Sequence, residues 1–96
     1  MKMIMISYNE AIDVEVAEAL EKCNLKNYTK VAGTYGKGKT SGTHLGSDIW
    51  PGRNNILYVA CRDEDVKPLI ASIKDLRKAL GREGIKAFVL PVEDMT

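Results

Sequence analysis

The chain has 96 residues, 45% of them apolar, and carries 14 Lys and Arg against 13 Asp and Glu. This length corresponds to one small domain, which leaves much of its apolar surface in water and therefore favours association with a partner. The near-zero net charge excludes the strongly basic surface that is typical of nucleic-acid-binding domains. Since no apolar run approaches the roughly 20 residues that span a bilayer, we expect a cytoplasmic protein without membrane insertion.

The first half of the chain predicts a strand, a helix and a second strand. Residues 2–8 are dense in apolar side chains, which suits a strand covered on both faces in the centre of a sheet. Between residues 12 and 23, apolar residues recur at steps of three and four among acidic ones, which predicts an amphipathic helix. Residues 28–35 carry β-branched and aromatic side chains and predict a second strand, weakened by Gly33.

The second half begins with a segment of unusual composition. Six of the eight glycines fall between residues 33 and 52, and the stretch from 36 to 55 has no sustained period, which predicts a long loop. Residues 55–61 lack polar alternation and predict a third, central strand. Three acidic residues then open a second helix that stops before Gly81, and residues 85–92 predict an edge strand because they contain a proline.

The order βαββαβ predicts the fold class. Each β-α-β half crosses over right-handed, which places both helices on one face of a four-stranded antiparallel sheet. This α+β arrangement is the ferredoxin-like sandwich, with residues 1–96 forming a single domain. The other sheet face then carries apolar side chains that a lone domain cannot hide, so we expect association through the sheet. The candidates for this second face are Tyr28, Val31, Val59, Phe88 and Leu90.

Two short stretches combine glycine with lysine. The first, Gly-Lys-Gly-Lys-Thr-Ser-Gly-Thr at 36–43, offers consecutive amides that can cradle phosphate oxygens. It is not a Walker loop, because the glycine–lysine spacing is not met and no helix follows. The second, Gly-Arg-Glu-Gly-Ile-Lys at 81–86, joins the second helix to the last strand. Each stretch has two readings, an anion site or a simple connection in which the glycines only cap a helix and form a turn.

Other kinds of chemistry find little support in the residues. His44 is the only histidine, and without a Gly-x-Ser-x-Gly motif a nucleophile–base arrangement is not indicated, so we expect no enzyme. A metal site built on His44 and Asp48 would need further ligands that the sequence does not identify. Cys23 and Cys61 lie far apart without metal or redox spacing, which predicts two reduced thiols. The third strand also lacks the paired aromatic residues that stack RNA bases.

Three stretches resemble the PII signalling proteins and their shorter PII-like relatives. Tyr-Thr-Lys-Val-Ala-Gly-Thr-Tyr-Gly-Lys-Gly at 28–38 looks like the second strand of that family and the base of its T-loop. Gly-Arg-Glu-Gly-Ile-Lys-Ala-Phe-Val at 81–89 is similar to the B-loop and the start of the last strand, and Leu-Pro-Val-Glu at 90–93 looks like that strand's end. In order and length of elements, the resemblance covers nearly the whole chain.

The resemblance implies a homotrimer of ferredoxin-like subunits whose sheets face inward. An adenine nucleotide, ATP, ADP or AMP, would lie in each cleft between neighbours. Occupancy of the cleft by the nucleotide would set the shape of a T-loop at about 37–54. The T-loop would then bind or release a partner protein such as a membrane transporter. Carried over by position, the phosphate contacts would be Gly36, Lys37 and Gly38 at the T-loop base, and Gly84 and Lys86 in the B-loop.

The chain also departs from longer members of that family. No tyrosine lies between Lys37 and Asn55, so uridylylation of a T-loop tyrosine is not expected. The chain ends at Thr96, before the segment that carries phosphate-binding arginines in longer members, which leaves the choice among nucleotides and other small anions open. The interpretation that we favour is therefore a non-enzymatic, PII-like trimeric sensor of a small anion. The alternative is a CutA-like trimer involved in divalent-metal binding or tolerance.

Overall fold

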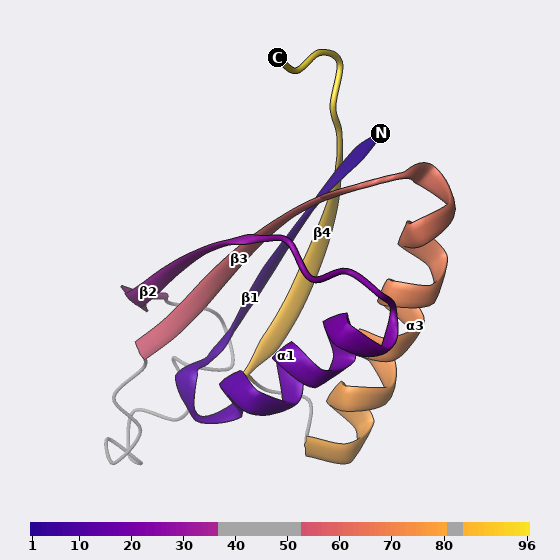
Figure 1. The fold of residues 1–96 in the computed structure, drawn as a ribbon. Coiled ribbons are helices and arrows are strands. Elements are labelled where there is room, and N and C mark those ends of the chain that lie inside the picture. Colours follow the sequence, from indigo (N-terminus) through magenta and orange to yellow (C-terminus); the bar gives the residue numbers. More distant parts are fainter. Residues whose placement is uncertain (37–52, 81–83) are drawn as a thin grey trace.

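The computed structural model describes residues 1–36, 53–80 and 84–96, and it confirms the ferredoxin-like βαββαβ order (Figure 1). The elements are β1 (Lys2–Asn9), the 3-10 helix η1 (Glu10–Ile12), α1 (Asp13–Lys22), β2 (Thr29–Tyr35), β3 (Arg53–Cys61), α3 (Asp63–Leu80) and β4 (Ile85–Pro91). Most of the segment expected to be a long loop, and residues 81–83 of the second glycine-containing stretch, lie outside the described residues. The third strand begins at Arg53, two residues before its predicted start at Asn55.

The four strands form one antiparallel sheet in the order β2-β3-β1-β4. As predicted, the first and third strands are central, and the proline-containing β4 is an edge strand. Both α-helices cover the same face of the sheet, and no helix of the described residues covers the opposite face (Figure 1). β2 ends and β4 begins at one end of the sheet, while both chain termini lie at the other end.

The core lies between the helices and one face of the sheet. β1 alternates strictly, with Ile4, Ile6 and Tyr8 buried towards the helices and the residues between them half-buried. This alternation follows from the strand period of two, which sends successive side chains to opposite faces. The strands and helices together contribute the remaining buried apolar side chains, which are Val16, Ala19, Leu20, Leu57, Val59, Cys61, Leu69, Ile73 and Ile85.

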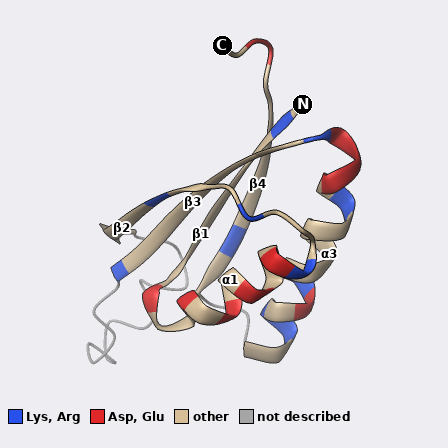
Figure 2. Cartoon of the chain, in the orientation of Figure 1, with Lys and Arg blue, Asp and Glu red and all other residues tan. Residues whose placement is uncertain are grey.

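Charge patterning supports both helices. Acidic residues occupy the first turns of α1 and α3, and basic residues their last turns, the arrangement favoured by the helix dipole (Figure 2). Before α1, the Asn9 side chain accepts a hydrogen bond of 2.9 Å from the Ala11 amide and caps η1. After α1, Asn24 adopts a positive φ of 58°, which ends the helix. Among the described residues, no helix is long and apolar enough to cross a membrane.

The sheet face opposite the helices, here called the open face, divides into two halves. Its apolar half consists of Met3, Met5, Val31, Ile56, Tyr58, Ala60, Phe88 and Leu90, which the strand register places on one side of the sheet. Within this half, Phe88 and Leu90 are 47% and 45% exposed. The polar half lies beside it, at the end where β2 stops and β4 starts, and consists of Ser7, Asn9, Thr34, Asn54 and Lys86.

One predicted member of the open face was placed wrongly. Val59 pairs with the buried Ile4, points towards the helices and is fully buried, so it belongs to the core. Val31, Phe88 and Leu90 do lie on the open face and are exposed, as expected. Tyr28 is also exposed, but it precedes β2.

Candidate functional site

The fold brings Gly36 and Gly84, one from each glycine-containing stretch, to the same end of the sheet. Gly36 follows β2, Gly84 precedes β4, and two asparagines of the central strands lie between them. The backbone N–H of Asn9 donates a hydrogen bond of 2.7 Å to the Gly84 carbonyl, and Asn9 is the register partner of Asn54. A Cβ placed at Gly36 would stand 3.0 Å from the Asn54 side-chain nitrogen. The row Gly36, Asn54, Asn9, Gly84 therefore crosses the whole sheet.

Lys86 adds a positive charge to this end of the sheet. It is exposed and pairs with Ser7 of β1, so its side chain emerges on the open face, in the polar half. Of the predicted site residues, the structure thus gathers Gly36, Gly84 and Lys86 at one end of the sheet. Lys37 and Gly38 lie outside the described residues.

The sequence interpretation missed Asn9, Asn54 and Ser7. Apolar residues predominate on the open face of β1 until Ser7, and on that of β3 between Ile56 and Ala60. A change from apolar to polar residues on one face of a strand, close to a glycine-containing stretch, was the available signal. It could be used only once the register was known, because a shift of one residue exchanges the two faces.

The end of β2 carries an irregularity that sets the course of the chain towards Gly36. The pairing of β2 with β3 shifts between Val31 and Thr34, and Gly33 within this bulge has a φ of +70°. A side chain at Gly33 would meet nothing within 4 Å, so glycine is favoured there by its backbone conformation and not by lack of space. Two contacts hold the bulge: the Thr34 hydroxyl donates to the Asn54 carbonyl (2.8 Å), and the Gly33 amide donates to the Asn55 side chain (3.4 Å).

Asp13, the first residue of α1, gathers three donors from three strands. Its carboxylate accepts hydrogen bonds from the Tyr8 hydroxyl (2.5 Å), the Lys30 ammonium (2.8 Å) and the Asn55 amide (3.2 Å). The bond from Lys30, followed by that from Tyr8, lowers the pKa of Asp13 below its usual range. Burial, followed by the bond to Asp13, raises the pKa of Tyr8.

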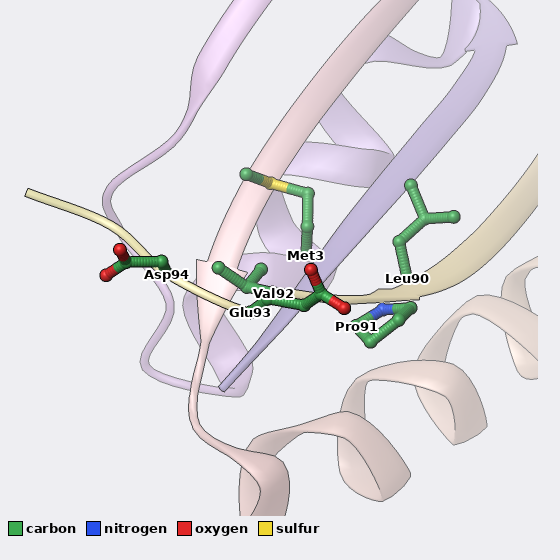
Figure 3. Close-up of a pocket in the computed structure, with 6 residues that line it drawn as sticks. All are labelled: Met3, Leu90, Pro91, Val92, Glu93 and Asp94. Atoms are coloured by element: carbon green, nitrogen blue, oxygen red, sulfur yellow. The ribbon is translucent and has the colours of Figure 1, made fainter.

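A surface pocket of about 550 Å³ lies at the opposite end of the sheet, where β1 begins and β4 ends (Figure 3). Its lining residues are Met3, Leu90, Pro91, Val92, Glu93 and Asp94, and Met3 and Leu90 are register partners on the open face. Because the charged groups of this lining are two carboxylates, the pocket is a poor site for an anion. The chemistry that favours an anion is at the glycine end of the sheet.

The structure offers little for a metal ion in the part that it describes. No group of three or more His, Cys, Asp and Glu side chains among residues 1–36, 53–80 and 84–96 is arranged to hold one. His44 and Asp48, the residues considered for such a site, lie outside those ranges. The metal-binding alternative therefore gains no observation in its favour.

Comparison with solved structures finds the same fold in CPII, a nitrogen regulatory PII-like protein from Thiomonas intermedia K12. Its structure with ADP, AMP and bicarbonate is 22% identical in sequence and has a TM-score of 0.72, over 95% of this chain and 88% of CPII. Its structure with ADP, AMP and acetate is 22% identical, with a TM-score of 0.71 over 93% and 82% of the two chains. The apo form is 19% identical, with a TM-score of 0.70 over 92% and 84%. At this level of identity, the likeness shows the fold alone.

Comparison with models of sequence families assigns the chain to a family. A search of curated proteins gives no significant match. In contrast, the family described as "Nitrogen regulatory protein P-II" matches residues 1–96, which is the whole chain. The fold agrees with this match, and the chain belongs to the nitrogen regulatory protein P-II family.

Proposed function

We propose that the chain is a PII-like homotrimeric regulator that senses an adenine nucleotide between its copies and signals through residues 37–54 to a partner protein. The observation that carries this proposal is the convergence of Gly36, Gly84 and Lys86 at one end of the sheet. Glycine-rich backbone can present its N–H groups to an anion, and a lysine nearby supplies a positive charge that attracts phosphate oxygens. Lys37 and Gly38 would extend this cradle from the Gly36 side.

The open face supports a trimer. Its apolar half exposes large side chains such as Phe88 and Leu90, which a domain of this size leaves in water unless another copy covers them. The polar half adjoins it and would lie at the border between two copies. A nucleotide bound there would contact the glycine end of one copy and the surface of its neighbour.

The described part of the site suits binding without catalysis. Its side chains are two asparagines, a serine, a threonine and a lysine, which donate and accept hydrogen bonds but lack a base beside a nucleophile. Membership of a family of regulatory proteins points the same way. We therefore propose a regulatory role, in which the occupied site changes the conformation of a loop and so its affinity for a partner.

The choice of adenine nucleotides follows the CPII structures, which contain ADP together with AMP. Applied to this chain, it predicts that ADP or AMP binds with measurable heat. The test is calorimetric titration of the purified protein with ATP, ADP and AMP in turn. A protein that binds none of the three nucleotides would contradict the proposal.

Lys86→Ala identifies the site. We expect this substitution to weaken nucleotide binding at least tenfold, because it removes a cation that lies on the open face two residues after Gly84. Lys74→Ala is the matched control, since Lys74 is an exposed lysine of α3, on the other side of the sheet. Equal affinities of the two variants would show that the nucleotide binds elsewhere.

A further inference from the structure

Asn55 is the buried polar residue among the described part of the chain, with 5% of its surface exposed. Both ends of its side-chain amide are engaged. Its nitrogen donates to the Asp13 carboxylate (3.2 Å), and its oxygen accepts from the Gly33 amide (3.4 Å). A buried amide held in this way has a fixed orientation, because turning it over would place a donor against Gly33 and an acceptor against a carboxylate.

Asp13 accepts the hydrogen bond from the Asn55 side chain and is itself held in place by two further donors. The carboxylate also binds the Tyr8 hydroxyl and the Lys30 ammonium, so it is held by β1 and β2 as well as by Asn55 of β3. Tyr8 is almost fully buried, and its hydroxyl has this carboxylate as its partner. The polar cluster of Tyr8, Asp13, Lys30 and Asn55 therefore ties the start of α1 to three strands.

The contact from Asn55 to Gly33 falls on the β2 bulge. Gly33 has a positive φ, and the strand register shifts around it. Only Thr34 and Tyr35 separate this bulge from Gly36, which lies against the Asn54 side chain. A change in the bulge would therefore shift the pairing of Thr34 and Tyr35 with β3, and with it the place of Gly36 beside Asn54.

We propose that Asn55 and Asp13 are positioning residues for the candidate nucleotide site. They lie on the helix side of the sheet. They would act by holding the β2 bulge at Gly33 in the conformation that puts Gly36 beside the bound nucleotide. This inference rests on the proposed function for its effect on affinity, but its structural part concerns Gly33 and Gly36 alone. A buried asparagine would need partners for stability in any case, so the test must separate position from stability.

The variant that removes the connection is Asn55→Ala. Its matched control is Val59→Ala, because Val59 lies four residues further along β3 on the same face, is fully buried and has no part in the polar cluster. Both variants lose a buried side chain of the same strand, and only the first releases the Gly33 amide. A third variant, Asp13→Asn, keeps an acceptor of the same shape on α1 and leaves Asn55 in place, and it serves if Asn55→Ala does not fold.

Two measurements are made on each variant, at a temperature where urea titration shows it to be folded. The first is the affinity for ADP by calorimetry. We expect Asn55→Ala to bind at least tenfold more weakly than the parent protein, Asp13→Asn to bind a few-fold more weakly, and Val59→Ala to bind within twofold of it. The second is the amide chemical shifts of Gly33 and Gly36 without ligand, which we expect to move in Asn55→Ala and Asp13→Asn but to stay in place in Val59→Ala.

The two measurements separate the inference from the function on which it rests. If the parent protein binds no nucleotide, the proposed function is wrong, and the amide shifts alone then decide whether Asn55 and Asp13 position Gly36. If the parent binds ADP but Asn55→Ala and Val59→Ala bind it equally, the positioning role is overturned. Unchanged Gly33 and Gly36 shifts in Asn55→Ala would overturn it as well.

Discussion

Asn54 of β3 packs against the backbone of Gly36, where an added Cβ would stand 3.0 Å from the asparagine side-chain nitrogen. This distance is shorter than ordinary van der Waals contact, so any side chain at residue 36 must push the Asn54 amide aside. The atom that would be met is the end of a flexible side chain, which can move. Gly36 is therefore required for the arrangement of the site more than for the stability of the fold.

Gly36→Ala tests this relationship. We expect the free energy of unfolding to change by less than about 1 kcal/mol, because the neighbour can yield. The affinity for ADP should fall at least several-fold, because the methyl group displaces the Asn54 amide and narrows the space beside the backbone amides. Urea denaturation and calorimetry measure the two effects. Unchanged affinity would show that the close approach at Gly36 has no part in binding.

Gly33→Ala should behave in the opposite way. The positive φ of Gly33 strains any residue with a Cβ, so this variant is expected to lose about 1–2 kcal/mol of stability although nothing lies within 4 Å of the new methyl group. Gly33→Asn should lose less, because asparagine tolerates the left-handed region better than alanine. Chemical denaturation of both variants gives the comparison, and equal losses would rule out the backbone explanation.

Tyr8 should remain protonated in strongly alkaline solution. Its raised pKa in the folded protein means that its contribution to stability is present below about pH 10 and is lost as the pH rises further. One of the four tyrosines should therefore ionise together with unfolding, as seen by tyrosinate absorbance. In Tyr8→Phe this component should be missing, and stability at neutral pH should fall by about 1 kcal/mol because Asp13 loses a donor.

Asp13 should account for part of the loss of folding stability at low pH. Because its pKa is lower in the folded than in the unfolded chain, its contribution to stability is present above about pH 4 and is lost as the pH falls below it. Asp13→Asn should therefore be less stable than the parent protein at pH 7, by about 1 kcal/mol for a half-exposed pair, and the difference should shrink in acid. Urea titrations across this pH range measure it. A difference that stays constant with pH would contradict the assignment.

Phe88→Asp should disrupt the proposed trimer. The substitution puts a charge in the apolar half of the open face, where a neighbouring copy would bury it without a partner. We expect monomers by analytical ultracentrifugation, with the secondary structure retained in circular dichroism. Val14→Asp is the control, because Val14 is 65% exposed on α1, away from the sheet face. Identical assembly of both variants would exclude the open face as the interface.

Much of the fold was predictable because β1 and both helices carry clear patterns. The right-handed crossover rule then placed the helices on one face, and the strand directions of this topology brought Gly36 and Gly84 to the same end of the sheet. The orientation of β3 was harder to predict. Apolar residues occupy both of its faces, so no alternation showed that Val59 points towards the helices, and only the register with Ile4 settles it.

The finer parts of the site depend on three-dimensional contacts that have no local signal. Asn9 and Asn54 lie at strand ends, where asparagine is ordinarily a turn or capping residue, and Asn9 does cap η1. Gly33 looked like a weak point of a strand but forms the bulge ahead of Gly36. The link from Asn55 to Asp13 joins residues 42 positions apart, beyond any periodic pattern.

The open face carries its apolar and polar halves side by side on the same four strands, which has a thermodynamic consequence. A ligand held at the border between copies would bind the assembled state and not the separated chains. Occupancy and association are then linked, so that added ligand strengthens assembly and dilution of the protein weakens the apparent affinity. The protein's own concentration would then be a second variable that sets the response of the proposed sensor.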